Sequence, residues 1–196
     1  MFIMILILNL WMGIAIMRTE KIDFNSTEVK AFIESINNLE YGEPLSKKNR
    51  LLWNNYYEAG FYYLLNENLK KSLHFYEKAK DLIPENPLSY RYIGTIYQQQ
   101  NELEKARDNL EKALSINPDY TMAKQVLINV YGNIVARQPE RFTDMKRLVQ
   151  LLLEAGEYDQ AQVVIEYLLK KKPEDREAEQ LLEKIKSSSQ IPSIEK

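Results

Sequence analysis

Apolar residues recur at helical spacing along most of this chain. The first such stripe begins just after Ser26, a residue type that often caps the start of a helix. It ends before Gly42 and Pro44, which interrupt helices. Intervals of three and four residues place these side chains on one helix face. We therefore expect a leading helix that covers one end of a stack; its apolar stripe is Val29, Phe32, Ile33, Ile36 and Leu39.

Four residue identities then recur at a fixed distance of 34 positions. A period of about 34 residues is the length of a repeat made of two helices and a turn. Glycine and alanine allow two helices to approach closely, an aromatic residue fills the seam between them, and proline ends a helix. The repeated pairs are Gly60 with Gly94, Tyr63 with Tyr97, Ala79 with Ala113, and Pro84 with Pro118.

The segments 53–86 and 87–120 carry the residues of a known pattern in the same order. The second segment, which matches better, has Tyr90, Ile93, Gly94, Tyr97, Ala106, Leu110, Ala113 and Pro118. These residues resemble the tetratricopeptide repeat family. The resemblance implies an all-α protein, a right-handed α-solenoid of stacked antiparallel helix hairpins. Such stacks present an extended curved surface for binding other chains.

The remainder of the predicted solenoid, which spans residues 47–186, is less regular. A partial repeat at 121–141 meets Pro139, and a fresh unit starts at 142 and runs to 175, with a turn at Gly156 that resembles the turn inside a hairpin. The helix at 121–136 either stands alone or stacks continuously, and we favour stacking because a lone helix would expose Val126, Leu127 and Val130. A capping helix at 177–186 and a disordered tail at 187–196 complete the expected order.

Residues 1–17 are almost entirely apolar, and charge begins at Arg18 within a linker and leading helix assigned to 18–46. A helix of this length rises roughly 25 Å against a hydrocarbon core of about 30 Å. We favour a retained N-terminal hydrophobic helix that anchors the chain in a membrane. Arg18 and Lys21 then place the repeats on the cytoplasmic side. The alternatives are a signal peptide cleaved near Ala15, which leaves an exported protein, and translation from Met17.

The composition of the chain excludes most kinds of catalytic and metal-binding site. The net charge is −2, which gives no overall field for nucleic acid. There is no cysteine and a single histidine, His74, so neither a catalytic triad nor a histidine–cysteine metal site can be assembled. The glycines are isolated, so there is no phosphate-binding loop. We expect a non-catalytic protein with no catalytic residues, no metal site and no cofactor.

The family resemblance also implies a groove lined by the first helix of each hairpin. Tyr57 and Phe61 stand where some family members use lysine and asparagine to grip the acidic end of a chaperone, so that role is not expected. Phe61 and Leu64 have an alternative role, packing under the leading helix. The expected partner-binding residues are Tyr57, Phe61, Leu64, Leu65, Arg91, Thr95, Gln98, Gln99, Gln125, Asn129 and Asn133.

Three functions follow from these observations. The first is a membrane-tethered adaptor whose groove binds a segment of an unidentified partner protein. The second is a soluble or exported scaffold of the same fold. The third is a regulatory module whose groove binds a small ligand.

Overall fold

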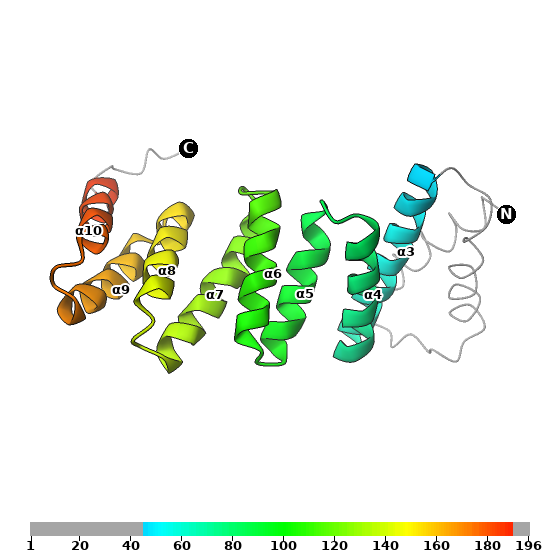
Figure 1. Ribbon diagram of the computed structural model, residues 1–196, viewed down its shortest axis with the longest axis horizontal. Coiled ribbons are helices and arrows are strands. Elements are labelled where there is room, and N and C mark those ends of the chain that lie inside the picture. Colours follow the sequence, from blue (N-terminus) through cyan, green and yellow to red (C-terminus); the bar gives the residue numbers. More distant parts are fainter. Residues whose placement is uncertain (1–44, 190–196) are drawn as a thin grey trace.

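The computed structural model describes residues 45–189, and within this range the chain forms eight α-helices and no strand. The helices follow one another in chain order along the longest axis of the molecule, with α3 and α10 at opposite ends (Figure 1). The predicted all-α solenoid is confirmed for these residues. The helices are α3 (Leu45–Leu65), α4 (Leu69–Leu82), α5 (Pro87–Gln99), α6 (Leu103–Ile116), α7 (Thr121–Arg137), α8 (Phe142–Ala155), α9 (Tyr158–Lys171) and α10 (Arg176–Ser189).

The proposed hydrophobic helix at 1–17 and all of the proposed linker and leading helix except residues 45 and 46 lie outside the described residues. None of the helices within 45–189 has the length and apolar content needed to cross a bilayer. Two helix ends differ from the sequence-based expectation. Helix α3 begins at Leu45, ahead of the repeat predicted from residue 53, and α10 continues to Ser189, three residues beyond its predicted end. Ser187 is accommodated there because its hydroxyl donates to the Lys184 carbonyl, a local bond serine makes readily at helix ends.

Two kinds of turn connect the helices. The turns after α3, α5 and α8 each contain one residue with positive φ: Glu67 at 57°, Asn101 at 65° and Gly156 at 77°. The Gly156 N–H donates to the carbonyls of Leu152 and Leu153, which closes α8. The other turns carry proline instead, as at Pro139 between α7 and α8. Helix α7 therefore lies between two proline-type turns, and this explains why the third repeat breaks.

The two repeated glycines occupy close helix crossings. A Cβ at Gly60 would lie 3.0 Å from the Tyr76 ring, and one at Gly94 would lie 2.6 Å from Cγ of Leu110. The contacts join α3 to α4 and α5 to α6, so the predicted close approach within each hairpin is confirmed. Ala79 and Ala113 are fully buried on the second helices.

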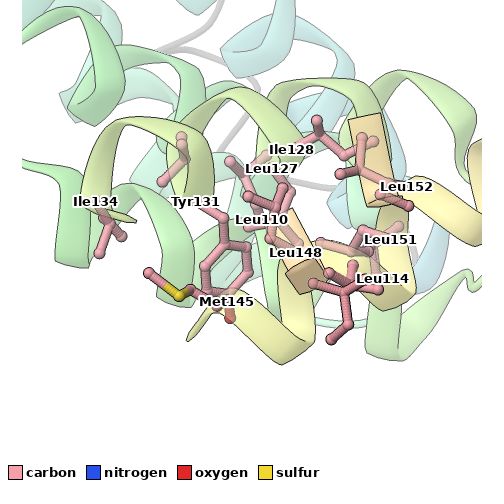
Figure 2. Close-up of a cluster of buried hydrophobic side chains, with 14 of the residues drawn as sticks. Leu110, Leu114, Leu127, Ile128, Tyr131, Ile134, Met145, Leu148, Leu151 and Leu152 are labelled. Carbon is pink, nitrogen blue, oxygen red and sulfur yellow. The ribbon is translucent and has the colours of Figure 1, made fainter. Parts of the chain in front are cut away.

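Every helix packs against the next one, so the continuous stack is confirmed. Leu127 and Val130 of α7 are fully buried. They belong to a core that extends from α6 to α10, part of which appears in Figure 2, where side chains of α6, α7 and α8 meet. A second, smaller core of Tyr76, Ile93 and Ile96 joins α4 to α5.

Candidate functional site

The first end of the predicted groove is an aromatic cluster, made of Tyr57, Phe61, Tyr76 and Tyr92. The Tyr76 and Tyr92 rings stack with centroids 4.7 Å apart, and Phe61 meets Tyr92 edge-on at 6.0 Å. The Tyr57 hydroxyl donates to that of Tyr92 at 3.2 Å. Burial, followed by this hydrogen bond, raises the pKa of Tyr57 above its ordinary value. These side chains are largely engaged with one another, and Leu64 packs against the same core.

Arg91 is only 8% exposed, although it occupies a predicted groove position. Its Nε donates to the Tyr120 hydroxyl at 2.7 Å, and its guanidinium carbon lies 3.7 Å from the centroid of the Tyr92 ring. Both contacts engage the guanidinium inside the protein, and the bond to Tyr120 links α5 to the start of α7. The Thr95 hydroxyl donates to the Arg91 carbonyl at 3.0 Å, within the same helix. Neither side chain is presented as a free binding group.

The other end of the predicted groove forms a hollow of about 520 Å³. It brings together Gln98 of α5 with Asn129 and Asn133 of α7, all three of which the sequence predicted as groove residues. Gln99 and Gln125 are exposed but do not line the hollow, and Leu65 is 54% exposed. The residues that line the hollow are Gln98, Ile128, Asn129, Gly132, Asn133, Leu148, Leu152, Gln160 and Val164.

The lining of the hollow combines amides with an apolar surface, and none of its residues is charged. Gln160 and Val164 come from α9, and Leu148 and Leu152 come from α8. Figure 2 shows Leu148 and Leu152 near Ile128 of α7. The exposed lining is therefore mixed, with amide groups around a smaller apolar base, and convergent hydrogen-bonding groups of this kind fix the orientation of a bound group.

The sequence did not predict the part that α8 and α9 contribute. Leu148 and Leu152 fit the inner stripe of a helix, and nothing in their spacing separates a core leucine from one at the base of a hollow. The available signal was the break in phase at Pro139, because a disturbed junction changes how neighbouring helices meet. Gly132 was a second signal, since it sits where no repeat pattern requires a small residue.

Reactive groups are dispersed over residues 45–189. No three histidine, cysteine or acidic side chains in this range lie close enough to hold a metal ion. His74 is exposed on α4 beside Phe75. Glu111 belongs to a structural ionic group: it accepts from Arg147 at 2.8 and 2.9 Å and from the Tyr131 hydroxyl at 2.9 Å, which joins α6, α7 and α8.

Comparison with known proteins gives one match to a family model, one curated relative and a number of solved structures. Residues 87–120 match the tetratricopeptide repeat family. Mouse (Mus musculus) sperm-associated antigen 1 is 37% identical over 75 residues, which are 37% of this chain and 8% of that protein. The chain thus corresponds to a small part of this relative.

Two solved structures are among those that match this chain. The TPR domain of Arabidopsis OM64 has 15% identity and a TM-score of 0.42, covering 71% of this chain and 98% of that one. The first TPR of Spaghetti (RPAP3), solved with an HSP90 peptide, has 18% identity and a TM-score of 0.40, covering 70% and 94%.

Proposed function

We propose that this chain, which belongs to the tetratricopeptide repeat family, is a non-catalytic scaffold that binds a segment of a partner protein on the concave side of a right-handed helical stack. The observation that supports this most directly is the meeting of Gln98, Asn129 and Asn133 at one hollow. These amides come from two helices that are adjacent first helices in the repeat pattern. Amide side chains both donate and accept hydrogen bonds, as a peptide backbone does.

The residues of the predicted groove divide into two roles in this proposal. Tyr57, Phe61, Leu64 and Arg91 support the stack, while the amide end makes the direct contacts. Arg91, which the sequence suggested as a binding residue, has a supporting role in this proposal. Its replacement would remove its bond to Tyr120 and its contact with Tyr92. An Arg91 variant would therefore confuse a folding defect with a binding defect.

Membrane tethering is a second part of the proposal and rests on residues 1–17 alone. If this segment anchors the chain, the full-length protein sediments with membranes and resists extraction by high salt and alkaline carbonate. N-terminal sequencing of the mature protein separates the anchor from a cleaved signal. Recovery of the chain at native mass in the supernatant would contradict the tether and leave the scaffold proposal intact.

Selection from a phage-displayed library of random peptides tests the scaffold proposal. The full-length chain is immobilised, and the dissociation constants of the selected peptides are measured for two variants. Asn129→Arg places a bulky charge at the hollow, whereas Ser115→Arg places it at an exposed position on α6, which contributes nothing to the hollow. We expect weaker binding only for Asn129→Arg. The reverse pattern, or no selected peptide at all, would contradict the proposal.

A further inference from the structure

Gly132 is the one glycine inside a described helix that has no packing reason to be glycine. A Cβ built at this position meets no atom within 4 Å, whereas one at Gly60 or Gly94 would collide with the facing helix. Glycine in the interior of a helix is less favourable than alanine because it loses more conformational freedom on folding. Its presence in α7 therefore weakens the helix without any gain in helix packing.

The open space beside Gly132 is the hollow itself. Gly132 lines it together with Asn129 and Asn133, which lie three residues before and one residue after it on the same helix. Helix α7 packs against α6 and α8 but has little direct contact with α9, although Gln160 and Val164 of α9 line the same hollow. A larger side chain at position 132 would occupy this space.

We propose that Gly132 keeps the hollow open for one large aliphatic side chain of a bound peptide segment, whose backbone pairs with the surrounding amides. This inference rests on the proposed function and names its ligand class. The hydrogen bonds come from Gln98, Asn129 and Gln160. The apolar contact comes chiefly from the half-buried Val164, because Leu148 and Leu152 at the base of the hollow are only 5% and 2% exposed.

The absence of charged side chains from the lining indicates which kind of peptide segment the hollow prefers. No lysine or arginine lines the hollow to pair with a carboxylate, and no acidic residue lines it to pair with a cation. Burial of an unpaired charge is costly, whereas an uncharged backbone can exchange its hydrogen bonds with water for bonds to amide side chains. The preferred occupant is therefore an uncharged, extended segment with a leucine-like side chain, and not an acidic terminus.

The test uses synthetic nine-residue peptides in which serine, threonine and glutamine flank one central residue. Binding to the full-length chain is measured by fluorescence anisotropy for central leucine, alanine and glutamate. Burial of a leucine side chain predicts binding about tenfold to hundredfold tighter for leucine than for alanine. Gly132→Leu places a side chain in the part of the hollow beside α7 and should weaken binding of the leucine peptide at least about tenfold, while Ala136→Leu, at an exposed position on the same helix outside the hollow, should not.

Thermal melting of each variant separates blocked binding from misfolding. Because nothing lies within 4 Å of an added Cβ, Gly132→Leu should melt no lower than the native chain. Gly132→Ala is a second test variant. It should fold normally and should bind the leucine peptide with an affinity between those of the native chain and Gly132→Leu.

Four results would overturn the inference, and each points to a different fault. Loss of binding in Asn129→Arg but not in Gly132→Leu would keep the proposed function and refute the role of Gly132. Tighter binding of the glutamate peptide would refute the ligand class. A third result is that no peptide of this set binds, while binding of library-selected peptides still depends on Asn129. This result would refute the proposed insertion of one aliphatic side chain. If library-selected peptides bind independently of Asn129, the proposed function fails as well.

Discussion

At the scale of single residues, Gly94 and Gly132 show two opposite uses of a missing side chain. Gly94 is surrounded, so Gly94→Leu would force α5 and α6 apart and should destabilise the protein by roughly 1–3 kcal/mol. Gly132 faces open space, so Gly132→Ala should stabilise it by about 0.5–1 kcal/mol. Urea unfolding of both variants measures the difference. Equal midpoints for the two variants would mean that the crossing at Gly94 is wrongly placed.

Arg91 gives a second test at this scale. Its hydrogen bond to Tyr120 and its contact with the Tyr92 ring are both removed in Arg91→Ala. Hydrogen bonds to charged groups contribute about 1.5–3 kcal/mol each, so we expect a loss of that order in the free energy of unfolding. Gln99→Ala, at an exposed position on the same helix, is the control and should change it by less than about 0.5 kcal/mol. A neutral Arg91→Ala would show that this guanidinium is free to serve the groove.

At the scale of helices, Glu111 ties α6 to α7 and α8 and should make the stack sensitive to acid. Burial favours the neutral carboxyl, but the Arg147 guanidinium and the Tyr131 hydroxyl outweigh it and hold the pKa of Glu111 below its ordinary value. The unfolded chain therefore binds more protons than the folded one. The stabilisation is present above the unfolded pKa of about 4.3 and is lost as the pH falls through the lower folded pKa.

Substitution of Glu111 tests this dependence. Glu111→Gln keeps the shape of the side chain but removes its charge, so the stability of the variant should fall less steeply than that of the native chain below about pH 5. Urea midpoints measured from pH 7 to pH 3 give both slopes. Glu104→Gln provides the matched control, because Glu104 is an exposed residue on α6 whose carboxylate pairs with Arg141. Parallel curves for the native chain and Glu111→Gln would show that the network does not couple to pH.

At the scale of the whole molecule, the core is divided between the two ends of the stack. Leu127 lies in the large core of α6 to α10, whereas Tyr76 lies in the small core at α4 and α5. Leu127→Ala should cost about 2–5 kcal/mol and raise amide hydrogen exchange in α7 and α8 more than in α4, because repeats contact only their neighbours. Val163→Ala, 69% exposed, should leave exchange unchanged. A uniform rise along the chain would indicate a single cooperative unit.

The sequence predicted the repeating architecture because its markers act locally. Gly60, Gly94 and Pro118 each impose a close approach or a helix end, and these effects depend on few other residues. The hollow was harder to predict because it depends on how far α7 lies from α9, and residue spacing carries no such distance. The contacts of Arg91 were hard to predict for a related reason: its position in the repeat indicates the groove, whereas its partner Tyr120 is 29 residues away in the chain.

The side-chain amide resonances of asparagine and glutamine, recorded by nuclear magnetic resonance with a selected peptide, test the central proposal most directly. We predict that titration of the full-length chain shifts the resonances of Gln98, Asn129 and Gln160, while that of Asn109, which donates to the Lys105 carbonyl on α6, stays in place. Shifts confined to Asn109 and its neighbours on α6, with the amides of the hollow unchanged, would contradict the account.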